Sequence, residues 1–395
     1  MLNDLEIEME ERGLEAIVVS GGDFSRELYY LVRVVIPRGG IYFKRIRGEP
    51  EIIVSNVDVL RAEEGIVRNI RTFTEYGYEE LVRKHGSSAA MIQLYDKMFR
   101  RHGVEGNIGF YGIGDVGEAH RILKGLENLG YRVVGEARPN LLDRLMETKD
   151  PLEISEIKRV GLLVEKIMEE TITMISDNLG RGRTVTVGDA KRYARTLMAE
   201  AGLRLTEDLI LSSGERTADP HYLGVESEVI KRDTPVILDF YPQGDNMLYF
   251  DFTRTIIVGK ASKRLKHMYE DVLYAQDMAY DLLNRGNNTR LRDVVGEVCE
   301  FFEGKGYPTV RRLLAGDAAL KRGFIHSLGH GVGWSLSDLP RVSLISDDKL
   351  RRGQVFTLEP GLYEPGLGGI RIEDVYVSDG ERINRISRMD RTLER

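Results

Sequence analysis

The sequence predicts an α+β protein with two domains, an N-terminal α/β domain over residues 1–140 and a larger α+β domain over residues 145–395. Three observations predict this organisation. Short apolar strands alternate with helical stretches as far as residue 140, which is the pattern of an α/β layer. A long helix with clear start signals begins near residue 150. Beyond it, each pair of helices is followed by strands, as expected when helices cover one face of a mainly antiparallel sheet.

Composition narrows the class of protein. The 395 residues are 42% hydrophobic, enough for the cores of two or three domains. The net charge of −7, without a basic stripe, gives no footprint for nucleic acid. The one cysteine, Cys299, excludes an intramolecular disulfide and a cysteine-rich metal site. The acidic N-terminal segment is unlike a signal peptide, and apolar runs stay below the roughly 18 residues of a membrane span, so we expect a cytoplasmic protein.

The N-terminal domain is predicted from apolar strands separated by amphipathic stretches. Strands are expected at residues 16–19, 41–43, 52–54, 108–111 and 132–134. Helices are expected near residues 2–12, 77–84, 89–102 and 117–128. The segment Gly112–Gly117 fits the glycine pattern of a dinucleotide-binding turn. Too few strands follow it for a nucleotide crevice, so we interpret it as a strand-to-helix turn.

The larger domain opens on a helix with three start signals. Asp150 stands at the N-cap, Pro151 at the first helical position, and Glu153 completes a capping box. The domain then falls into two similarly organised halves. Helices near 152–177 and 187–201 precede a first hairpin, and helices near 263–284 and 290–304 precede a second group of strands.

Each half carries a hairpin with a pair of carboxylates. Thr234–Phe240 and Met247–Val258 flank a turn-forming stretch, and folding about residue 245 places Asp239 opposite Asp251. Side chains that lie opposite each other in such a pair share a face and are roughly 5 Å apart.

The second hairpin shows the same arrangement. Val355–Tyr363 and Gly369–Ser378 flank a glycine- and proline-rich turn. Folding about Gly366 places Glu359 opposite Glu373. Two hairpins that each present a carboxylate pair indicate that the four acids converge.

Four converging acids must be neutralised. At about 5 Å and an effective dielectric near 20, each pair repels by roughly 3 kcal/mol, and six pairs by on the order of 20 kcal/mol. Arg254 and Arg371 lie on the same strands, but two arginines do not balance four buried acids. His330, flanked by glycines, accompanies the acids, and we interpret it as a further ligand. Carboxylates with one imidazole suit divalent manganese, cobalt, iron or zinc, and five ligands suit two ions.

Four motifs around these residues resemble the pita-bread metallopeptidases, which include methionine aminopeptidase, aminopeptidase P, prolidase and the metal-free relative creatinase. The motifs are LDFYPQGDNMLYFDFTRT at 238–255, HSLGHGVG at 326–333, TLEPGLY at 357–363 and GIRIEDV at 369–375. The stretch METKDPLEI at 146–154 resembles the start of the catalytic domain in the prolidase and aminopeptidase P branch. All five ligand positions are filled, which argues against a metal-free site of the creatinase type.

The resemblance implies a pita-bread catalytic domain preceded by a creatinase-like N-terminal domain. It implies hydrolysis of Xaa-Pro bonds in short peptides, by a dipeptidase or an aminopeptidase that binds two divalent ions of manganese, cobalt, zinc or iron. The implied metal ligands are Asp239, Asp251, His330, Glu359 and Glu373. Of these, Asp251 and Glu373 would bridge the two ions. The N-terminal domain would contribute to a homodimer and narrow the site to short peptides.

The resemblance also assigns catalytic roles. Glu359 would take the proton of the attacking water and pass it to the leaving nitrogen. His221, in SGERTADPHY at 213–222, resembles the family's substrate histidine and would stabilise the oxyanion. Arg371 would orient Glu373 or bind a carboxylate, and screening of the acid cluster is an equally good interpretation.

One position departs from the family pattern. A second histidine usually follows the GHGxG motif in an HExP sequence, but here the stretch is SDLP, with Ser337 in place of that histidine. A hydroxyl donates a hydrogen bond but carries no proton charge near neutral pH. Two alternatives therefore stay open: a hydrolase or lyase for another small amide or organic acid, and a weakly active or inactive binding protein.

Overall fold

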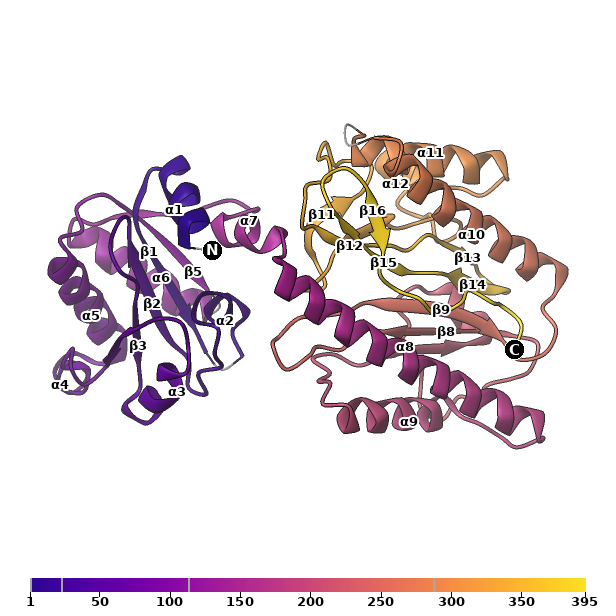
Figure 1. Ribbon diagram of the computed structural model, residues 1–395, viewed down its shortest axis with the longest axis horizontal. Coiled ribbons are helices and arrows are strands. Elements are labelled where there is room, and N and C mark those ends of the chain that lie inside the picture. The colour runs from indigo at the N-terminus through magenta and orange to yellow at the C-terminus, as the bar shows by residue number, and fades with distance from the viewer. Residues whose placement is uncertain (1, 23, 113, 287–288) are drawn as a thin grey trace. The chain divides into compact units, whose positions relative to one another are not determined.

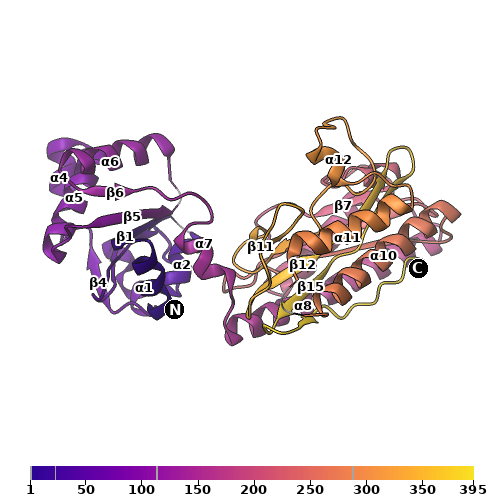
Figure 2. The same ribbon diagram turned by 90° about the horizontal axis from the view of Figure 1, so that it is seen from above.

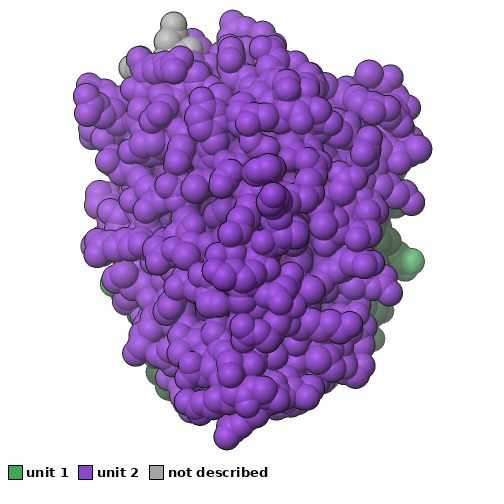
Figure 3. All heavy atoms as spheres, turned by 90° about the vertical axis from the view of Figure 1, so that its right-hand side faces the viewer, with its two compact units in different colours: residues 1–146 green, residues 147–395 purple. Residues whose placement is uncertain are grey.

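A computed structural model describes residues 2–22, 24–112, 114–286 and 289–395. The chain divides into two compact units, Met1–Met146 and Glu147–Arg395, which are coloured separately in Figure 3. Within the described residues, every helix is too short or too polar to cross a membrane.

Unit 1 is built on a mixed six-stranded sheet with the strand order β4-β3-β2-β1-β5-β6. The central strand β1 pairs antiparallel with β2 and parallel with β5. The strands are β1 (Leu14–Gly21), β2 (Gly40–Arg45), β3 (Glu51–Val54), β4 (Asn69–Thr72), β5 (Asn107–Gly112) and β6 (Arg132–Val134). The helices are α1 (Leu2–Glu11), α2 (Arg26–Val32), α3 (Val59–Glu63), α4 (Tyr78–His85), α5 (Ser87–His102), α6 (Val116–Asn128) and α7 (Leu141–Glu147).

The core of unit 1 lies between this sheet and the helices that follow β4. Phe43 of β2 packs against Phe99 of α5, and Phe99 also contacts Phe110 of β5. The predicted strands and helices are confirmed, but α2, α3, β4 and α7 are elements that the sequence analysis did not predict. The sequence of β4, NIRT, lacks the apolar alternation that marks a strand, and in the structure each of its residues is only partly buried.

The glycine-rich segment at residue 112 is a strand-to-helix turn where the structure describes it; Ile113 lies outside the described residues. Gly112 ends β5 with a φ of +115°, and a Cβ there would lie 1.8 Å from the carbonyl oxygen of Ser20. Asp115 then caps α6 by accepting a hydrogen bond from the backbone N–H of Glu118. The close approach of β1 therefore explains the glycine at position 112.

Unit 2 places a layer of helices over three small antiparallel sheets. The helices are α8 (Pro151–Gly180), α9 (Val187–Glu200), α10 (Lys263–Leu283), α11 (Leu291–Gly304) and α12 (Val310–Leu314). Figure 1 shows α8 crossing in front of β8 and β9, while α12 lies on the side of the unit away from α8 (Figure 2). The helix α8 contacts β8, and α10 contacts β12, β13 and β14. The predicted capping box at Asp150 is confirmed.

The strands of unit 2 form sheets of three, five and two strands. Their orders are β7-β8-β9, β11-β10-β12-β15-β16 and β13-β14. The strands are β7 (Ile210–Ser213), β8 (Pro235–Phe240), β9 (Phe252–Ile257), β10 (Gly329–Gly331), β11 (Asp338–Val342), β12 (Val355–Leu358), β13 (Gly361–Glu364), β14 (Gly368–Arg371), β15 (Asp374–Ser378) and β16 (Ile383–Arg385). The predicted order of two helices and then strands, repeated once, is confirmed.

The first hairpin has a different register from the predicted one. Asp239 pairs with Thr253, and Gln243 bridges Tyr249, so the chain folds about Asn246 and not about residue 245. The prediction that Asp239 lies directly opposite Asp251 is wrong by two residues. Because side chains alternate with a period of two, this shift leaves both carboxylates on the same face of the hairpin, as diagonal neighbours.

The second hairpin has the predicted register. Leu358 pairs with Asp374, and Gly361 pairs with Arg371, so the pairing on both sides of Glu359 folds about residue 366. The ladder is interrupted between these two pairs, where the strands part into different sheets.

The two hairpins lie side by side and are joined by β9. The hydroxyl of Thr253 donates to Oε2 of Glu373 at 2.8 Å, and the backbone N–H of Glu373 donates to the Thr253 carbonyl at 3.1 Å. The buried Arg254 pairs with Asp374 at 2.8 Å. Its guanidinium also donates to the carbonyl of Glu373 at 2.8 Å. These bonds bring the carboxylates of both halves to one place.

Candidate metal centre

The five residues predicted to bind metal all lie at strand ends or in a very short strand. Asp239 is near the end of β8, Asp251 directly precedes β9, and His330 is the middle residue of β10. Glu359 directly follows β12 and Glu373 directly precedes β15. Backbone at a strand end is free of the ladder on one side, so a side chain there can turn toward a shared centre.

Three of the five residues form a compact cluster. Asp251, His330 and Glu373 each offer a ligand atom, and these atoms all lie within 4.8 Å of one another. Nε2 of His330 is 3.6 Å from Oδ2 of Asp251 and 3.4 Å from Oε1 of Glu359. Nδ1 of His330 lies 3.1 Å from the carbonyl oxygen of Gly331 and donates a hydrogen bond to it. This hydrogen bond leaves the lone pair of Nε2 facing the carboxylates.

Asp239 is held beside the cluster by an arginine. Its Oδ2 accepts from Nη2 of Arg371 at 2.6 Å. Nη1 of Arg371 donates to the hydroxyl of Tyr363 at 3.0 Å and to the carbonyl of Pro220 at 3.1 Å. Arg371 thus contacts one of the four acids, whereas Arg254 turns away to Asp374. The ion pair with Asp239 supports the screening interpretation of Arg371.

Burial and mutual repulsion hold protons on the cluster. Burial raises the pKa of Asp251 well above its usual range, and the neighbouring Glu373 and Asp239 raise it further. Burial, followed by the charge of Glu373, raises the pKa of Glu359 to about 8. The pKa of Glu373 is likewise raised by burial and by Asp239. Each negative charge in this group is therefore unfavourable without a cation nearby.

Among the described residues, two buried carboxylate oxygens of the four acids have no hydrogen-bond donor. They are Oδ1 of Asp239 and Oε1 of Glu373. Buried acceptors are usually satisfied, so such atoms mark a position for another ligand. Carboxylate oxygens together with an imidazole nitrogen are the donor set that divalent manganese, cobalt, iron or zinc prefer. The residues present therefore fit divalent metal ions.

Three further residues near the cluster were not assigned a role from the sequence, namely His326, Tyr363 and Gln276. His326 contacts the Tyr363 hydroxyl with Nε2 at 3.0 Å and the Ser327 carbonyl with Nδ1 at 2.7 Å. Burial, with a smaller contribution from Arg371, lowers the pKa of His326 to about 3, so this imidazole is neutral. The position of His326 in the HSLGHGVG motif was a signal, but the tertiary contact to Tyr363 was not readable from the sequence.

The third residue, Gln276 of α10, is fully buried behind the two glutamates. Its Nε2 donates to the carbonyls of Leu358 at 2.9 Å and of Ile372 at 3.3 Å. These carbonyls directly precede Glu359 and Glu373, at the interruption of the ladder. Gln276 thus replaces the missing backbone bonds and ties the two strands together where the carboxylates emerge. A lone glutamine in a helix gives no sequence signal for this role.

The predicted substrate histidine lies on an exposed turn. His221 follows the 3₁₀-helix Gly214–Ala218, and its backbone N–H donates to Oδ1 of Asp219 at 3.2 Å. The turn is fixed next to the cluster, because the preceding residue, Pro220, accepts from Arg371. The structure therefore brings the His221 segment to the edge of the acid cluster.

Ser337 is exposed, whereas its neighbour is built into the core. Asp338 pairs with the buried Lys149 at 2.9 Å and accepts from the backbone N–H of Trp334 at 2.8 Å. The backbone N–H of Ser337 donates to the Ser335 hydroxyl at 3.0 Å. The segment that carries Ser337 is thus held from both sides while its side chain faces solvent.

Comparison with known proteins identifies the family. Residues 155–379, more than half of the chain, match the sequence profile of metallopeptidase family M24. The chain belongs to this family. The matched M24 segment contains His221 and all five predicted metal ligands. The predicted family is therefore confirmed.

Individual M24 proteins are similar over different lengths. The chain is 33% identical to the Xaa-Pro dipeptidase of Pyrococcus furiosus over 251 residues, which is 63% of this chain and 65% of that enzyme. The chain thus spans less than two thirds of the length of the first curated relatives that it matches.

Solved structures match over almost the whole chain. The Xaa-Pro dipeptidase from Bacillus anthracis has a TM-score of 0.80 at 23% identity, covering 100% of this chain and 98% of that one. The prolidase from Pyrococcus horikoshii OT3 has a TM-score of 0.79 at 22% identity, covering 99% of each chain. The predicted fold, a pita-bread domain preceded by an N-terminal domain, is confirmed.

Proposed function

We propose that this chain is a metallopeptidase that hydrolyses Xaa-Pro bonds in short peptides with two divalent metal ions. The observation that carries the proposal is the cluster of Asp251, His330 and Glu373, with Glu359 beside it. The similarity to an enzyme named Xaa-Pro dipeptidase supports the choice of bond. A peptide whose second residue is proline has no amide hydrogen at the scissile nitrogen, so cleavage depends on a delivered proton.

The ligands divide between two ions in this proposal. Asp251 and Glu373 would be shared by the two ions, Asp239 would help to hold one of them, and His330 with Glu359 would help to hold the other. Bound ions of this kind lower the pKa of a water and stabilise negative charge on a carbonyl oxygen. The donor set suits manganese, cobalt, zinc or iron.

The protein side chains supply proton transfer and positioning. Oε1 of Glu359 lies at the edge of the cluster, 3.4 Å from Nε2 of His330, and Glu359 would take the proton of the attacking water and return it to the leaving nitrogen. His221 stands on the exposed turn beside the cluster and would donate to the substrate carbonyl. Arg371 orients Asp239 through their ion pair. We extend the proposal to a cytoplasmic homodimer whose N-terminal domain narrows the site, on the basis of the family resemblance alone.

Metal analysis combined with a dipeptide panel tests the proposal. The purified full chain is stripped with EDTA, reloaded with Mn²⁺, Co²⁺ or Zn²⁺, and assayed on Ala-Pro, Gly-Pro and Ala-Ala. We expect close to two ions per chain and cleavage of the proline peptides. Asp251→Asn should abolish turnover in a folded protein. The proposal would be refuted if the wild-type chain retained no metal after reloading, or if the reloaded chain cleaved no Xaa-Pro peptide.

A further inference from the structure

The segment of residues 387–395, which we call the strap, is fixed against other elements of unit 2. The carboxylate of Glu165 in α8 accepts from the backbone N–H groups of Arg388 and Met389, at 2.9 and 2.6 Å. The backbone of Ile257 in β9 bonds the end of the strap, and Figure 1 shows this end of the chain beside β9. These bonds give the strap a defined path across unit 2.

Arg391 brings the strap into contact with α10. Its carbonyl accepts from the hydroxyl of Tyr269 at 2.5 Å, and its Nη1 donates to Oε1 of Gln276 at 2.9 Å. The same nitrogen pairs with the exposed Asp277 at 2.7 Å. Gln276 is fully buried, whereas the side chain of Arg391 is 22% exposed. Arg391 therefore connects a buried amide to the surface.

The hydrogen bonds of Gln276 fix the orientation of its amide. A guanidinium only donates, so Oε1 must face Arg391, and carbonyls only accept, so Nε2 must face the carbonyls of Leu358 and Ile372. Without Arg391 the buried Oε1 would lose the donor that the structure provides, and the amide would be drawn toward water. Its bonds to the two carbonyls, which directly precede the two glutamates of the cluster, would then weaken.

A second arginine ties the strap to the peptide group that follows Glu373. Nη1 of Arg254 donates to the carbonyl of Glu373 at 2.8 Å. The Nε and Nη2 atoms of Arg254 donate to the carbonyls of Asp390 and Met389, each at 3.0 Å. Because Gln276 holds the carbonyl before Glu373, the peptide groups on both sides of this glutamate are linked to the strap.

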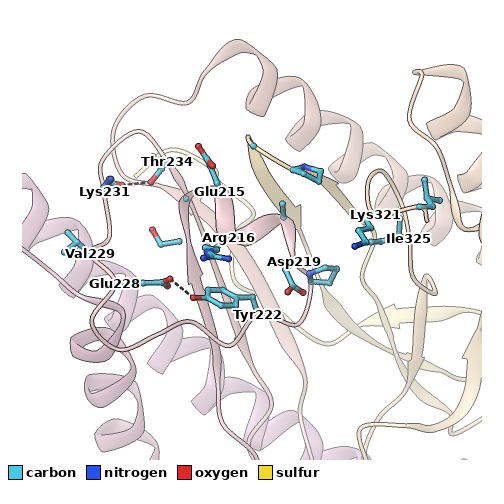
Figure 4. Close-up of a pocket in the computed structure, with 17 residues that line it drawn as sticks. Glu215, Arg216, Asp219, Tyr222, Glu228, Val229, Lys231, Thr234, Lys321 and Ile325 are labelled. Carbon is cyan, nitrogen blue, oxygen red and sulfur yellow. Dashed lines mark hydrogen bonds between the residues drawn. The ribbon is translucent and has the colours of Figure 1, made fainter. Parts of the chain in front are cut away.

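The pocket of unit 2 is separate from these contacts. It has a volume of about 1040 Å³ and is lined by other side chains, including Arg216, Asp219 and Lys321 (Figure 4). Neither Arg391 nor Gln276 is among the described residues that line it. A peptide bound in this pocket would not touch either side chain, so we expect Arg391 to act on the metal centre through the backbone and not through the substrate.

Resting on the proposed function, we propose that Arg391 is a positioning residue of the metal centre. It fixes the amide of Gln276 and thereby the two strands at the points where the glutamates of the cluster emerge. The strap thus contributes to metal affinity without supplying a ligand.

Hydrogen exchange of the metal-stripped full chain tests this role in the absence of metal. The backbone N–H groups of Glu359 and Glu373 donate to the carbonyls of Leu328 and Thr253, so both should be protected in the wild type. Arg391→Met keeps the apolar stem and removes the donor. We expect these two amides to exchange about tenfold faster in Arg391→Met, while the amides of β8 keep their wild-type rates. Equal acceleration in β8, or unchanged rates at both glutamates, would overturn the proposal.

Two variants isolate the bond between Arg391 and Gln276. Asp277→Ala removes the exposed ion pair of Arg391 and leaves its bond to Gln276, so we expect wild-type exchange at both glutamates. Arg391→Lys keeps a donor on a stem of similar length and should restore most of the protection. Acceleration in Asp277→Ala equal to that in Arg391→Met would assign the effect to the surface ion pair and overturn the proposal.

Mn²⁺ affinity, measured by calorimetry, tests whether Arg391 acts through Gln276. We expect Arg391→Met to weaken binding about fivefold and Gln276→Leu about tenfold. The double variant should also lose about tenfold, because the arginine has no amide left to hold. A loss of about fiftyfold, the product of the single losses, would show independent action and overturn the proposal. If either single variant does not fold, the exchange rates of the other decide the outcome, since both should release the same two amides.

The two levels of the proposal fail differently. If the reloaded wild-type chain binds no Mn²⁺, the proposed function itself is wrong. If it binds Mn²⁺ but the amides of Glu359 and Glu373 exchange alike in wild type and Arg391→Met, the role of Arg391 is wrong while the proposed function stands.

Discussion

Replacing Glu359 by glutamine tests whether burial of the acid cluster lowers the stability of the folded protein when no metal is bound. The pKa of Glu359 is raised from the ordinary 4.5 to about 8, by burial first and then by Glu373. Between these two pH values the folded chain keeps a proton that the unfolded chain has released. The stability of protein stripped of metal must therefore fall as pH rises through this window.

The size of the effect follows from the two pKa values. Each pH unit between 4.5 and 8 costs the folded state about 1.4 kcal/mol, so ionising Glu359 at pH 8 costs about 5 kcal/mol. Glutamine has nearly the same shape and no charge to lose. In EDTA we expect Glu359→Gln to be more stable than wild type at pH 8 by several kcal/mol, with the difference vanishing near pH 4.5.

Urea unfolding followed by circular dichroism at pH 4.5, 6 and 8 measures this difference. Glu364→Gln is the control, because Glu364 lies in the same hairpin and faces Arg264 and Arg322 in place of other acids. Equal stability of wild type and Glu359→Gln at pH 8, or a loss in the variant, would refute the electrostatic reasoning. Added Mn²⁺ at a hundred times its Kd should stabilise wild type by about 2.7 kcal/mol, and the variant by less.

Three further substitutions test other parts of the site. Ser337→His should raise kcat on Ala-Pro, since it restores a side chain that carries a proton near neutral pH, and no gain would mean that this position does not limit turnover. Gln276→Leu removes both bonds to the carbonyls before the glutamates and should weaken Mn²⁺ binding by about tenfold in calorimetry, whereas unchanged affinity would make Gln276 only a packing residue. Arg254→Met takes the nearest cation from the buried Asp374 and should lower the free energy of unfolding by about 3 kcal/mol; a neutral result in urea would show that Ser387 and Arg385 suffice.

The sequence predicted the second hairpin better than the first for a local reason. Its turn is short and symmetric about Gly366, whose φ of +84° favours glycine, so the register of Glu359 and Glu373 follows from chain spacing alone. The first hairpin has a longer connection in which Gln243 bridges Tyr249, and the turn chemistry did not reveal where the chain reverses. The error of two residues in the partner of Asp239 did not change which side chains share a face, because side chains alternate with a period of two.

The contacts between the hairpins were beyond the reach of the sequence. The pattern placed Asp239 and Arg371 on different hairpins, and only the fold shows that they meet at 2.6 Å. The pair between Lys149 and Asp338 likewise joins residues that are 189 positions apart. Spacing within an element constrains its near neighbours, whereas partners of this kind depend on how separate elements pack.

The four acids of the cluster are divided between the two hairpins, with Asp239 and Asp251 on the first and Glu359 and Glu373 on the second. Their repulsion acts within the second hairpin, where burial and then Glu373 raise the pKa of Glu359, and across the joint between the hairpins, where burial and then Glu373 raise the pKa of Asp251. Among the described residues of the joint, Arg371 is the cation that contacts an acid of the cluster, because it reaches from the second hairpin to Asp239. Cations bound among the remaining carboxylates would also reduce the repulsion between acids at this joint. Metal binding would therefore be coupled to the docking of the two halves, and we expect a change that weakens either to weaken the other.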